Sequence, residues 1–123
     1  LARQLAGIGF DVYRKTTVGD NELRIADAVR TALDHSDVVI TTGGLGPTVD
    51  DKTREAVAKA TTSTLVLDQN LLQDIEAFFQ RRGREMGENN RRQAYIPHSA
   101  LPIPNPVGTA PGFIVKCDER HVI

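Results

Sequence analysis

The feature that most constrains the fold is an apolar strand that runs directly into a glycine-rich loop. Residues 37–42 read DVVITT, a β-branched run without polar alternation, which is typical of a parallel strand buried on both faces. The run ends at residues 43–48, GGLGPT, and a helical pattern follows. A strand that passes through a tight loop into a helix is the repeating unit of an α/β sheet. We therefore expect an α/β domain with a mostly parallel sheet.

The rest of the chain alternates between helical and strand-like patterns. Four helices are predicted. The first occupies the start of the chain and ends at the glycines Gly7 and Gly9, the second begins at Asn21, the third follows the glycine-rich loop, and the fourth spans residues 70–82. Strands are predicted at residues 10–17, 100–103 and 113–115, with a hairpin turn at 118–119. Residues 83–92 are polar and predict a mobile connection or a short helix.

Two helix starts carry candidate caps. Asp20 precedes the helix that begins near Asn21, and its carboxylate can accept a bond from the first turn. Thr48 and Asp51 have the spacing of a capping box at the start of the helix after the loop.

Composition limits the class of protein. The 123 residues, 40% hydrophobic and 25% charged, are enough for one globular core, and a net charge of −1 gives no overall attraction to nucleic acid or an anionic membrane. The single Cys117 cannot form an internal disulfide, and no Cys/His spacing resembles a zinc site. The longest apolar stretch, residues 38–40, is far shorter than the roughly 20 residues that span a bilayer. We expect one domain over residues 1–123, in the cytoplasm, without nucleic-acid or membrane partners.

The glycine-rich loop is the strongest candidate binding site. Gly43, Gly44 and Gly46 permit positive φ angles and a close approach of a ligand, and the next helix presents unpaired amides. The pattern matches neither the Walker loop nor the dinucleotide fingerprint. It indicates an anion or phosphate cradle; a tight strand-to-helix turn is the alternative.

Two carboxylates follow that loop directly. Asp50 and Asp51 would repel a bound phosphate unless a divalent cation such as Mg²⁺ lay between them, which makes them candidate metal ligands. Alternatively, they are first-turn acids that complement the helix dipole.

Several weaker candidates lie elsewhere in the chain. Residues 105–112, NPVGTAPG, form a stiff loop in which Asn105 and Thr109 can make hydrogen bonds to a ligand, or the loop is only a structural turn. Asp20 lies at another strand end and has a possible ligand role besides the cap. The arginines at 81, 82, 84, 91 and 92 could pair with phosphates or form a solvated basic face, and Cys117 reads as a small buried apolar residue.

The motif GGLGPTVDDKT, residues 43–53, resembles the signature of the molybdopterin-binding-like domain in the CinA (competence/damage-inducible protein) family, which is related to MogA, MoaB and MoeA. The resemblance extends through TVGDN (17–21), SDVVITTGG (36–44), GREMGENNRRQAYIP (83–97) and NPVGTAPGF (105–113). It implies a three-layer α/β/α sandwich. Family members begin with a further strand and continue into a further loop, so the chain is expected to be truncated at both ends.

The resemblance also implies a function. CinA-type domains are associated with metal-dependent hydrolysis of the pyrophosphate of ADP-ribose to AMP and ribose 5-phosphate. By motif, the three loop glycines would hold phosphate, Asp50 and Asp51 would serve as catalytic metal ligands, and Thr48 and Thr53 would support them. The residues that would line the ligand face are Asn105, Gly108, Thr109 and Gly112. The family commonly self-associates, so a homo-oligomer is expected.

Two alternatives remain open at this point. One is a non-catalytic module that binds molybdopterin or a pterin nucleotide, in which the aspartates organise no catalytic metal. The other is an interaction domain that keeps the fold without the site.

Overall fold

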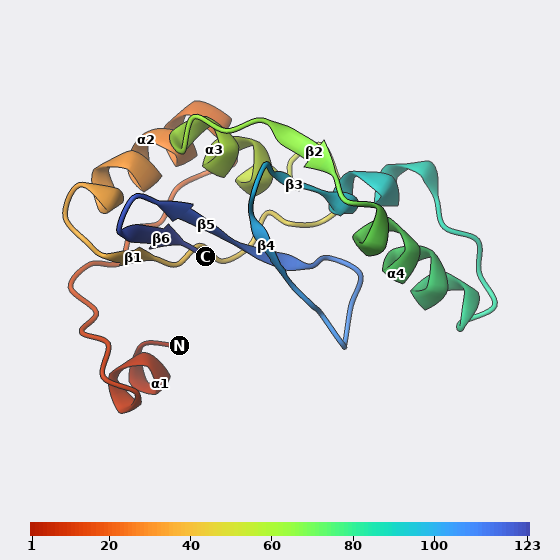
Figure 1. The fold of residues 1–123 in the computed structure, drawn as a ribbon, viewed down its shortest axis with the longest axis horizontal. Coiled ribbons are helices and arrows are strands. Elements are labelled where there is room, and N and C mark those ends of the chain that lie inside the picture. The colour runs from red at the N-terminus through yellow and green to blue at the C-terminus, as the bar shows by residue number, and fades with distance from the viewer.

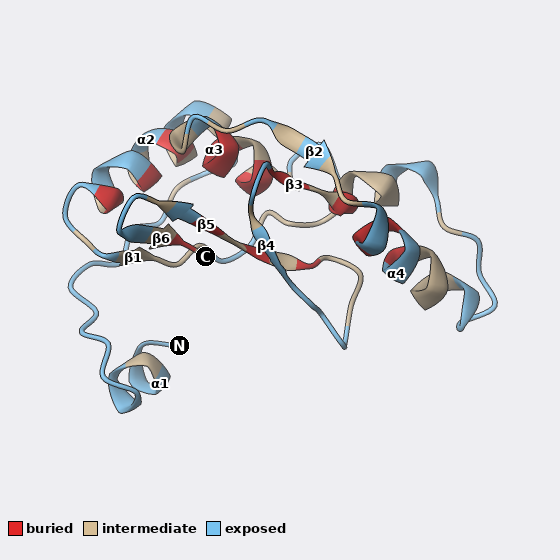
Figure 2. Cartoon of the chain, in the orientation of Figure 1, coloured by how far each residue is buried: buried red, intermediate tan, exposed pale blue.

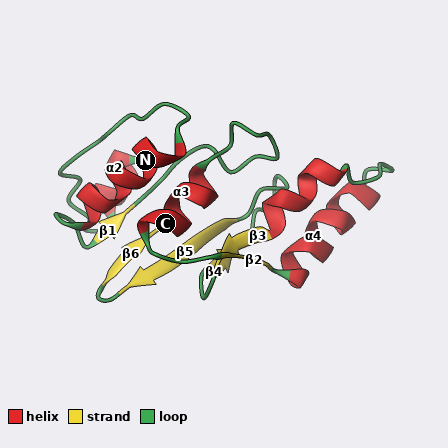
Figure 3. Ribbon diagram, turned by 90° about the horizontal axis from the view of Figure 1, so that it is seen from above, coloured by secondary structure: helices red, strands yellow, loops and turns green.

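The computed structural model describes residues 1–123 and confirms a mixed α/β fold. The elements in chain order are α1 (Ala2–Gly7), α2 (Glu22–Leu33), β1 (Val38–Val39), α3 (Thr53–Ala60), β2 (Leu65–Leu67), α4 (Gln69–Gln80), the 3₁₀ helix η1 (Glu88–Ala94), β3 (Tyr95–Pro97), β4 (Leu101–Ile103), β5 (Gly112–Cys117) and β6 (Arg120–Val122). Helices α2 and α3 pack together over one face of the main sheet, and α4 extends beyond it (Figures 1 and 3). None of the helices has the length and apolar character needed to cross a bilayer.

The main sheet has the order β1-β6-β5-β4 and is mixed. Only β1 and β6 run parallel, whereas β6–β5 and β5–β4 are antiparallel, so the prediction of a mostly parallel sheet is wrong. The cause is local for β5 and β6, because the predicted hairpin at 118–119 exists, with Asp118 at a φ of 55°, and a tight hairpin fixes antiparallel pairing.

The strand before the glycine-rich loop is shorter than predicted. Only Val38 and Val39 form β1, and both are half-buried rather than covered on both faces. Since β1 lies at the edge of the sheet, it has a partner on one side only. The backbone amide of Thr41 extends this contact by donating to the carbonyl of Ile123 at 2.6 Å.

The predicted strand at residues 10–17 is not formed. This segment is an exposed coil, and Tyr13 is 84% exposed (Figure 2). A β-prone sequence forms a strand only where a neighbour supplies ladder hydrogen bonds and a face to bury, and no strand lies alongside this one. Helix α1 forms as predicted but buries no residue, so of the two helical layers expected, only that of α2 and α3 packs on the sheet.

Two predicted helix caps are also wrong. The side chain of Asn21, not Asp20, caps α2 by accepting from the Arg24 amide at 3.0 Å. Helix α3 begins at Thr53, after an N-cap at Lys52 without a side-chain bond, so Thr48 and Asp51 lie ahead of the helix rather than on its first turn. The helix predicted at 70–82 is α4, and Asp68 caps it.

One hydrophobic core joins the helices to the sheet. The inner faces of α2 and α3 are buried against the strands, whereas the buried side of α4 packs mainly against η1; Figure 2 shows these buried segments in red. The core residues are Val29, Leu33, Val57, Leu71, Leu72, Ile75, Ala94, Ile96, Phe113, Val115 and Val122. Cys117 packs partly against this core, as predicted for a small apolar residue, and burial raises the pKa of its thiol.

The core predicts how two neighbouring strands respond to truncation. Phe113 in β5 is 3% exposed, and Phe113→Ala is expected to lower the free energy of unfolding by about 3–5 kcal/mol in urea titrations. Leu101→Ala in β4 is the control, because Leu101 is 66% exposed and its loss should change stability by less than about 0.5 kcal/mol. Equal effects from both variants would contradict this assignment of the core face.

Candidate functional site

The glycine-rich loop connects β1 to α3, as the sequence predicts. Gly43 and Gly44 have φ angles of 90° and 66°, a region that residues with a Cβ rarely adopt. At Gly44 a side chain would in addition collide with the hydroxyl of Thr53. The path of the backbone therefore requires glycine at both positions. The same backbone conformation suits a tight strand-to-helix turn and an anion cradle, so the glycine angles alone do not separate these two predictions.

The carbonyl groups of this loop point toward the start of α3. The hydroxyl of Thr53 donates to the carbonyl of Gly43 at 2.7 Å, and the backbone amide of Thr53 donates to the carbonyl of Gly44 at 3.1 Å. The guanidinium of Arg54 donates to the carbonyl of Leu45. Three consecutive carbonyls are thus held by two adjacent residues of one helix.

These bonds fix the direction of the amides as well. In a planar trans peptide the N–H points away from the C=O of the same unit. The amides of Gly44, Leu45 and Gly46 must therefore face away from α3. Those of Gly44 and Leu45 donate to no group of the protein. Consecutive amides on one side of a left-handed turn form a concave site for anions.

The carboxylate of Asp51 lies beside the amide of Gly46. Its Oδ2 accepts from the amide of Thr48 at 2.9 Å and from the hydroxyl of Thr48 at 2.6 Å. The Thr48 hydroxyl is the largest cause of a lowered pKa of Asp51, and the Gly46 amide and the charge of Arg54 lower it further. Asp51 is therefore ionised at neutral pH, and its carboxylate closes the turn after the glycines.

The two aspartates do not form a metal centre by themselves. Asp50 is exposed, one oxygen of Asp51 is already occupied by Thr48, and no group of three or more His, Cys, Asp or Glu side chains comes together. Mg²⁺ requires six oxygen ligands. An ion held here would take most of them from water and from the phosphates of a ligand.

The second predicted loop uses its polar atoms internally. The side chain of Asn105 donates to the carbonyl of Ala110 at 2.9 Å and accepts from the amides of Val107 and Gly108 at 3.1 and 3.0 Å. Gly112 starts β5, and the side chains of Thr109 and Asp20 form no hydrogen bond. No hydrogen bond joins Asn105, Gly108, Thr109, Gly112 or Asp20 to the glycine-rich loop, so the structure supports the structural reading for Asn105.

Two arginines support the loop. Sequence reasoning missed Arg54, and it named Arg92 only as one of several arginines that could pair with phosphates or form a solvated basic face. Arg54 is only 1% exposed. Arg92 donates to the carbonyl of Thr48 and to the carboxylate of Glu55, both at 3.0 Å, and it also lines a pocket of about 400 Å³ with Glu88, Asn89, Arg91 and Tyr95. One signal was available for Arg54, because a cation in the first turn opposes the helix dipole and needs a compensating partner.

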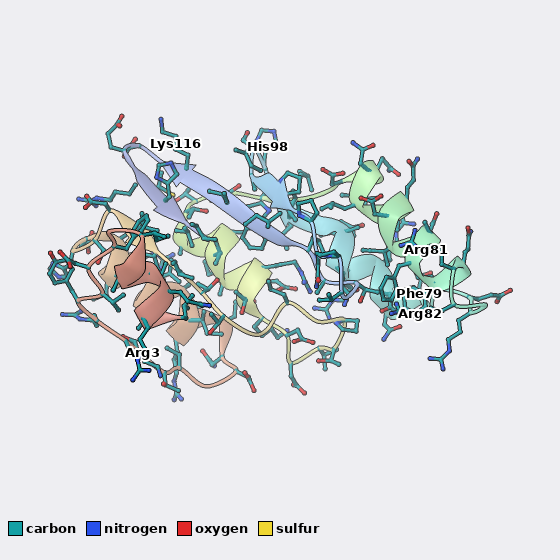
Figure 4. The ribbon with its side chains drawn as sticks, turned by 90° about the horizontal axis from the view of Figure 1, so that it is seen from below. Arg3, Phe79, Arg81, Arg82, His98 and Lys116 are labelled. Atoms are coloured by element: carbon teal, nitrogen blue, oxygen red, sulfur yellow. The ribbon has the colours of Figure 1, made fainter.

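Other arginines behave as a solvated basic face. Arg81 and Arg82 lie at the end of α4 near Phe79, as Figure 4 shows, and the Arg82 guanidinium stacks 3.7 Å from the centre of the Phe78 ring. They contribute nothing to the glycine-rich loop.

The lowered pKa of Asp51 predicts a pH-dependent contribution to stability. A depressed carboxyl pKa stabilises the fold above the ordinary value of 3.8, and this contribution disappears as pH falls through the lower folded value. Asp51→Asn should thus be less stable than the wild type at pH 7 in urea titrations, and the gap should narrow below about pH 3.8. Asp50→Asn is the matched control and should show no such gap. A gap for Asp51→Asn that stays constant with pH would refute the assignment.

Comparison with known proteins agrees with this geometry. The family model described as "Probable molybdopterin binding domain" matches residues 1–123. A competence-damage inducible protein of Halothermothrix orenii is 47% identical over 123 residues, and one of Symbiobacterium thermophilum is 50% identical. The chain is covered completely in both cases, but it spans only 30% and 29% of the lengths of these relatives.

A solved structure supports the same assignment. The crystal structure of the protein CinA, of unknown function, from Thermoplasma acidophilum superimposes with a TM-score of 0.90 at 38% identity, over 98% of this chain and 71% of that one. The match of the family model over the whole chain shows that this protein belongs to the molybdopterin-binding-like domain family, in its CinA-type branch.

Proposed function

We propose that this domain binds the phosphate group of a pterin or nucleotide small molecule at the amides of the glycine-rich loop. The observation that carries the proposal is the pair of unpaired amides at Gly44 and Leu45, because Thr53 holds the carbonyls of the same two peptide units, those of Gly43 and Gly44. The family description, a probable molybdopterin binding domain, supports a pterin as the ligand.

Local electrostatics favour an anion over a neutral ligand. The loop combines free amides, the positive end of the α3 dipole and the charge of Arg54 behind it. Asp51 opposes these, because its ionised carboxylate lies next to the Gly46 amide. A bound phosphate is therefore expected on the Gly44 and Leu45 side of the loop. The pocket beside Arg92 offers space for the remainder of the molecule.

Thr53 tests this proposal. Thr53→Val keeps the shape of the side chain and removes the hydroxyl that holds the Gly43 carbonyl. We expect saturable binding of pyrophosphate, AMP and a pterin phosphate by the wild type in calorimetric titrations, and about fivefold to tenfold weaker binding by Thr53→Val.

A matched control lies at the other end of the same helix. The hydroxyl of Thr61 donates to the carbonyl of Val57 at 2.8 Å, so Thr61→Val removes an equivalent bond far from the loop and should bind like the wild type. Absence of binding by the wild type, or equal loss in both variants, would sink the proposal.

A second candidate is hydrolysis of the pyrophosphate of ADP-ribose to AMP and ribose 5-phosphate with a divalent ion. It is favoured by the adjacent carboxylates of Asp50 and Asp51, the latter held ionised at the edge of the loop. Together with ligand phosphates they would hold the ion, which would neutralise charge on the phosphates. The chain's own contribution would be to bind and orient the substrate phosphate at the loop amides.

Asp51→Asn separates the two candidates. Asparagine keeps an acceptor for Thr48 and removes the negative charge, so binding without metal should stay equal or become tighter. If hydrolysis with Mg²⁺ is the function, AMP release from ADP-ribose should occur in the wild type and fall by at least about 100-fold in both Asp50→Asn and Asp51→Asn. No AMP release by the wild type would leave only the binding function.

A further inference from the structure

We propose that Arg54 is a positioning residue that holds the second half of the glycine-rich loop in its anion-binding conformation. The inference rests on the proposed function and extends it to a side chain that touches no ligand. Thr53 holds the carbonyls of Gly43 and Gly44, but nothing in that pair of bonds restrains the peptides that follow. Arg54 is the group that restrains them.

The guanidinium of Arg54 bridges two consecutive peptide units of the loop. Its Nη1 donates to the carbonyl of Leu45 and its Nη2 to the carbonyl of Gly46 at 2.7 Å. The planar guanidinium presents these two donors in a fixed fork, so both carbonyls are held in one relative orientation. The bond to Leu45 sets the direction of the Gly46 amide, because both belong to the same peptide unit. The Gly46 amide faces Asp51, so Arg54 fixes the peptide that directly follows the two free amides of Gly44 and Leu45.

The burial of Arg54 indicates that its two bonds to the loop carbonyls are structurally important. Only 1% of the residue is exposed, and transfer of a cation from water into the protein is unfavourable unless hydrogen bonds and opposite charges compensate. No carboxylate forms a salt bridge with Arg54, and the acidic groups near enough to favour its charge are Glu55 and Asp51. Two backbone carbonyls are thus its main direct partners.

The position of the charge adds a second contribution. The guanidinium lies on the carbonyl side of the loop, and the amides face the other way, so the cation stands behind the surface that meets the anion. In this partly dehydrated position its field is screened less than that of a surface arginine. Arg54 therefore both orients the loop and makes the ligand side more favourable for negative charge.

Lysine and methionine separate the two contributions. Arg54→Lys keeps the charge but replaces the planar fork by a single ammonium, which cannot hold both carbonyls in the same way. Arg54→Met keeps most of the apolar stem and removes both the charge and the donors. Arg30→Met is the control, since Arg30 is an exposed arginine that donates to the carbonyl of Lys59 at 3.0 Å, away from the loop.

The experiment measures pyrophosphate binding by calorimetry and the amide signals of Gly44, Leu45 and Gly46 by NMR. We expect about tenfold or greater loss of affinity for Arg54→Met, an intermediate loss for Arg54→Lys and none for Arg30→Met. The Gly46 amide signal should shift in both Arg54 variants before ligand is added. A variant that only loses stability would lower the melting temperature without this local shift.

The outcomes are distinguishable. Wild-type affinity in Arg54→Lys and Arg54→Met, with unmoved loop signals, overturns the role of Arg54 and leaves the proposed function standing. If the wild type itself fails to bind pyrophosphate, AMP or pterin phosphate, the proposed function fails, and the positioning of an anion site by Arg54 is overturned with it. Should Arg54→Met not fold, Arg54→Lys decides by the same two measurements.

Discussion

The bonds between the loop carbonyls and the first two residues of α3 determine the character of the site. A glycine-rich loop alone has many conformations, and only some of them turn several amides to the same side. Here Thr53 and Arg54 draw the carbonyls of residues 43–46 toward the helix, which leaves the amide hydrogens on the outside. The core beneath α3, centred on the fully buried Val57, keeps the two anchoring residues in place.

Asp51 is the residue on which the two functional candidates disagree. In the structure its carboxylate closes the turn through Thr48, a structural role that neither candidate requires. The same carboxylate keeps a negative charge close to the phosphate-binding amides. In a simple binding module that charge weakens the site, whereas in a hydrolase it helps to hold a cation. The change in anion affinity on removal of the Asp51 charge, measured with and without a divalent ion, therefore distinguishes a binding module from a hydrolase.

The sequence predicts local features of this protein well and long-range features poorly. The path from β1 through the glycines into α3, helix α4 and the hairpin at Asp118 all depend on neighbouring residues, and all are present. The parallel pairing of β1 with β6 joins segments far apart in the chain, and the sequence contains no signal for it. The three-residue strands β2 and β3 are too short to show a period. Residues 10–17 have strand composition without a neighbouring strand.

The candidate site divides in the same way. Gly43, Gly44, Thr53 and the acidic pair were identifiable because they form one contiguous motif. Arg54 directly follows that motif, yet a charged residue on a helix normally points to solvent, and only the three-dimensional packing reveals that it is buried. Arg92 reaches the loop from a 3₁₀ helix 44 residues away in sequence, which no local pattern could predict.

The uniform direction of the loop peptides also limits what the loop can recognise. A surface made of N–H groups offers hydrogen-bond donors and no acceptors, so it separates anions from other molecules without reading what the anion is attached to. Pro47 ends the row, because it has no N–H to add. Discrimination between a pterin and a nucleotide must then come from side chains outside the loop. Substitutions outside the loop can consequently change which ligand this fold prefers, while the binding of phosphate by the loop amides stays the same.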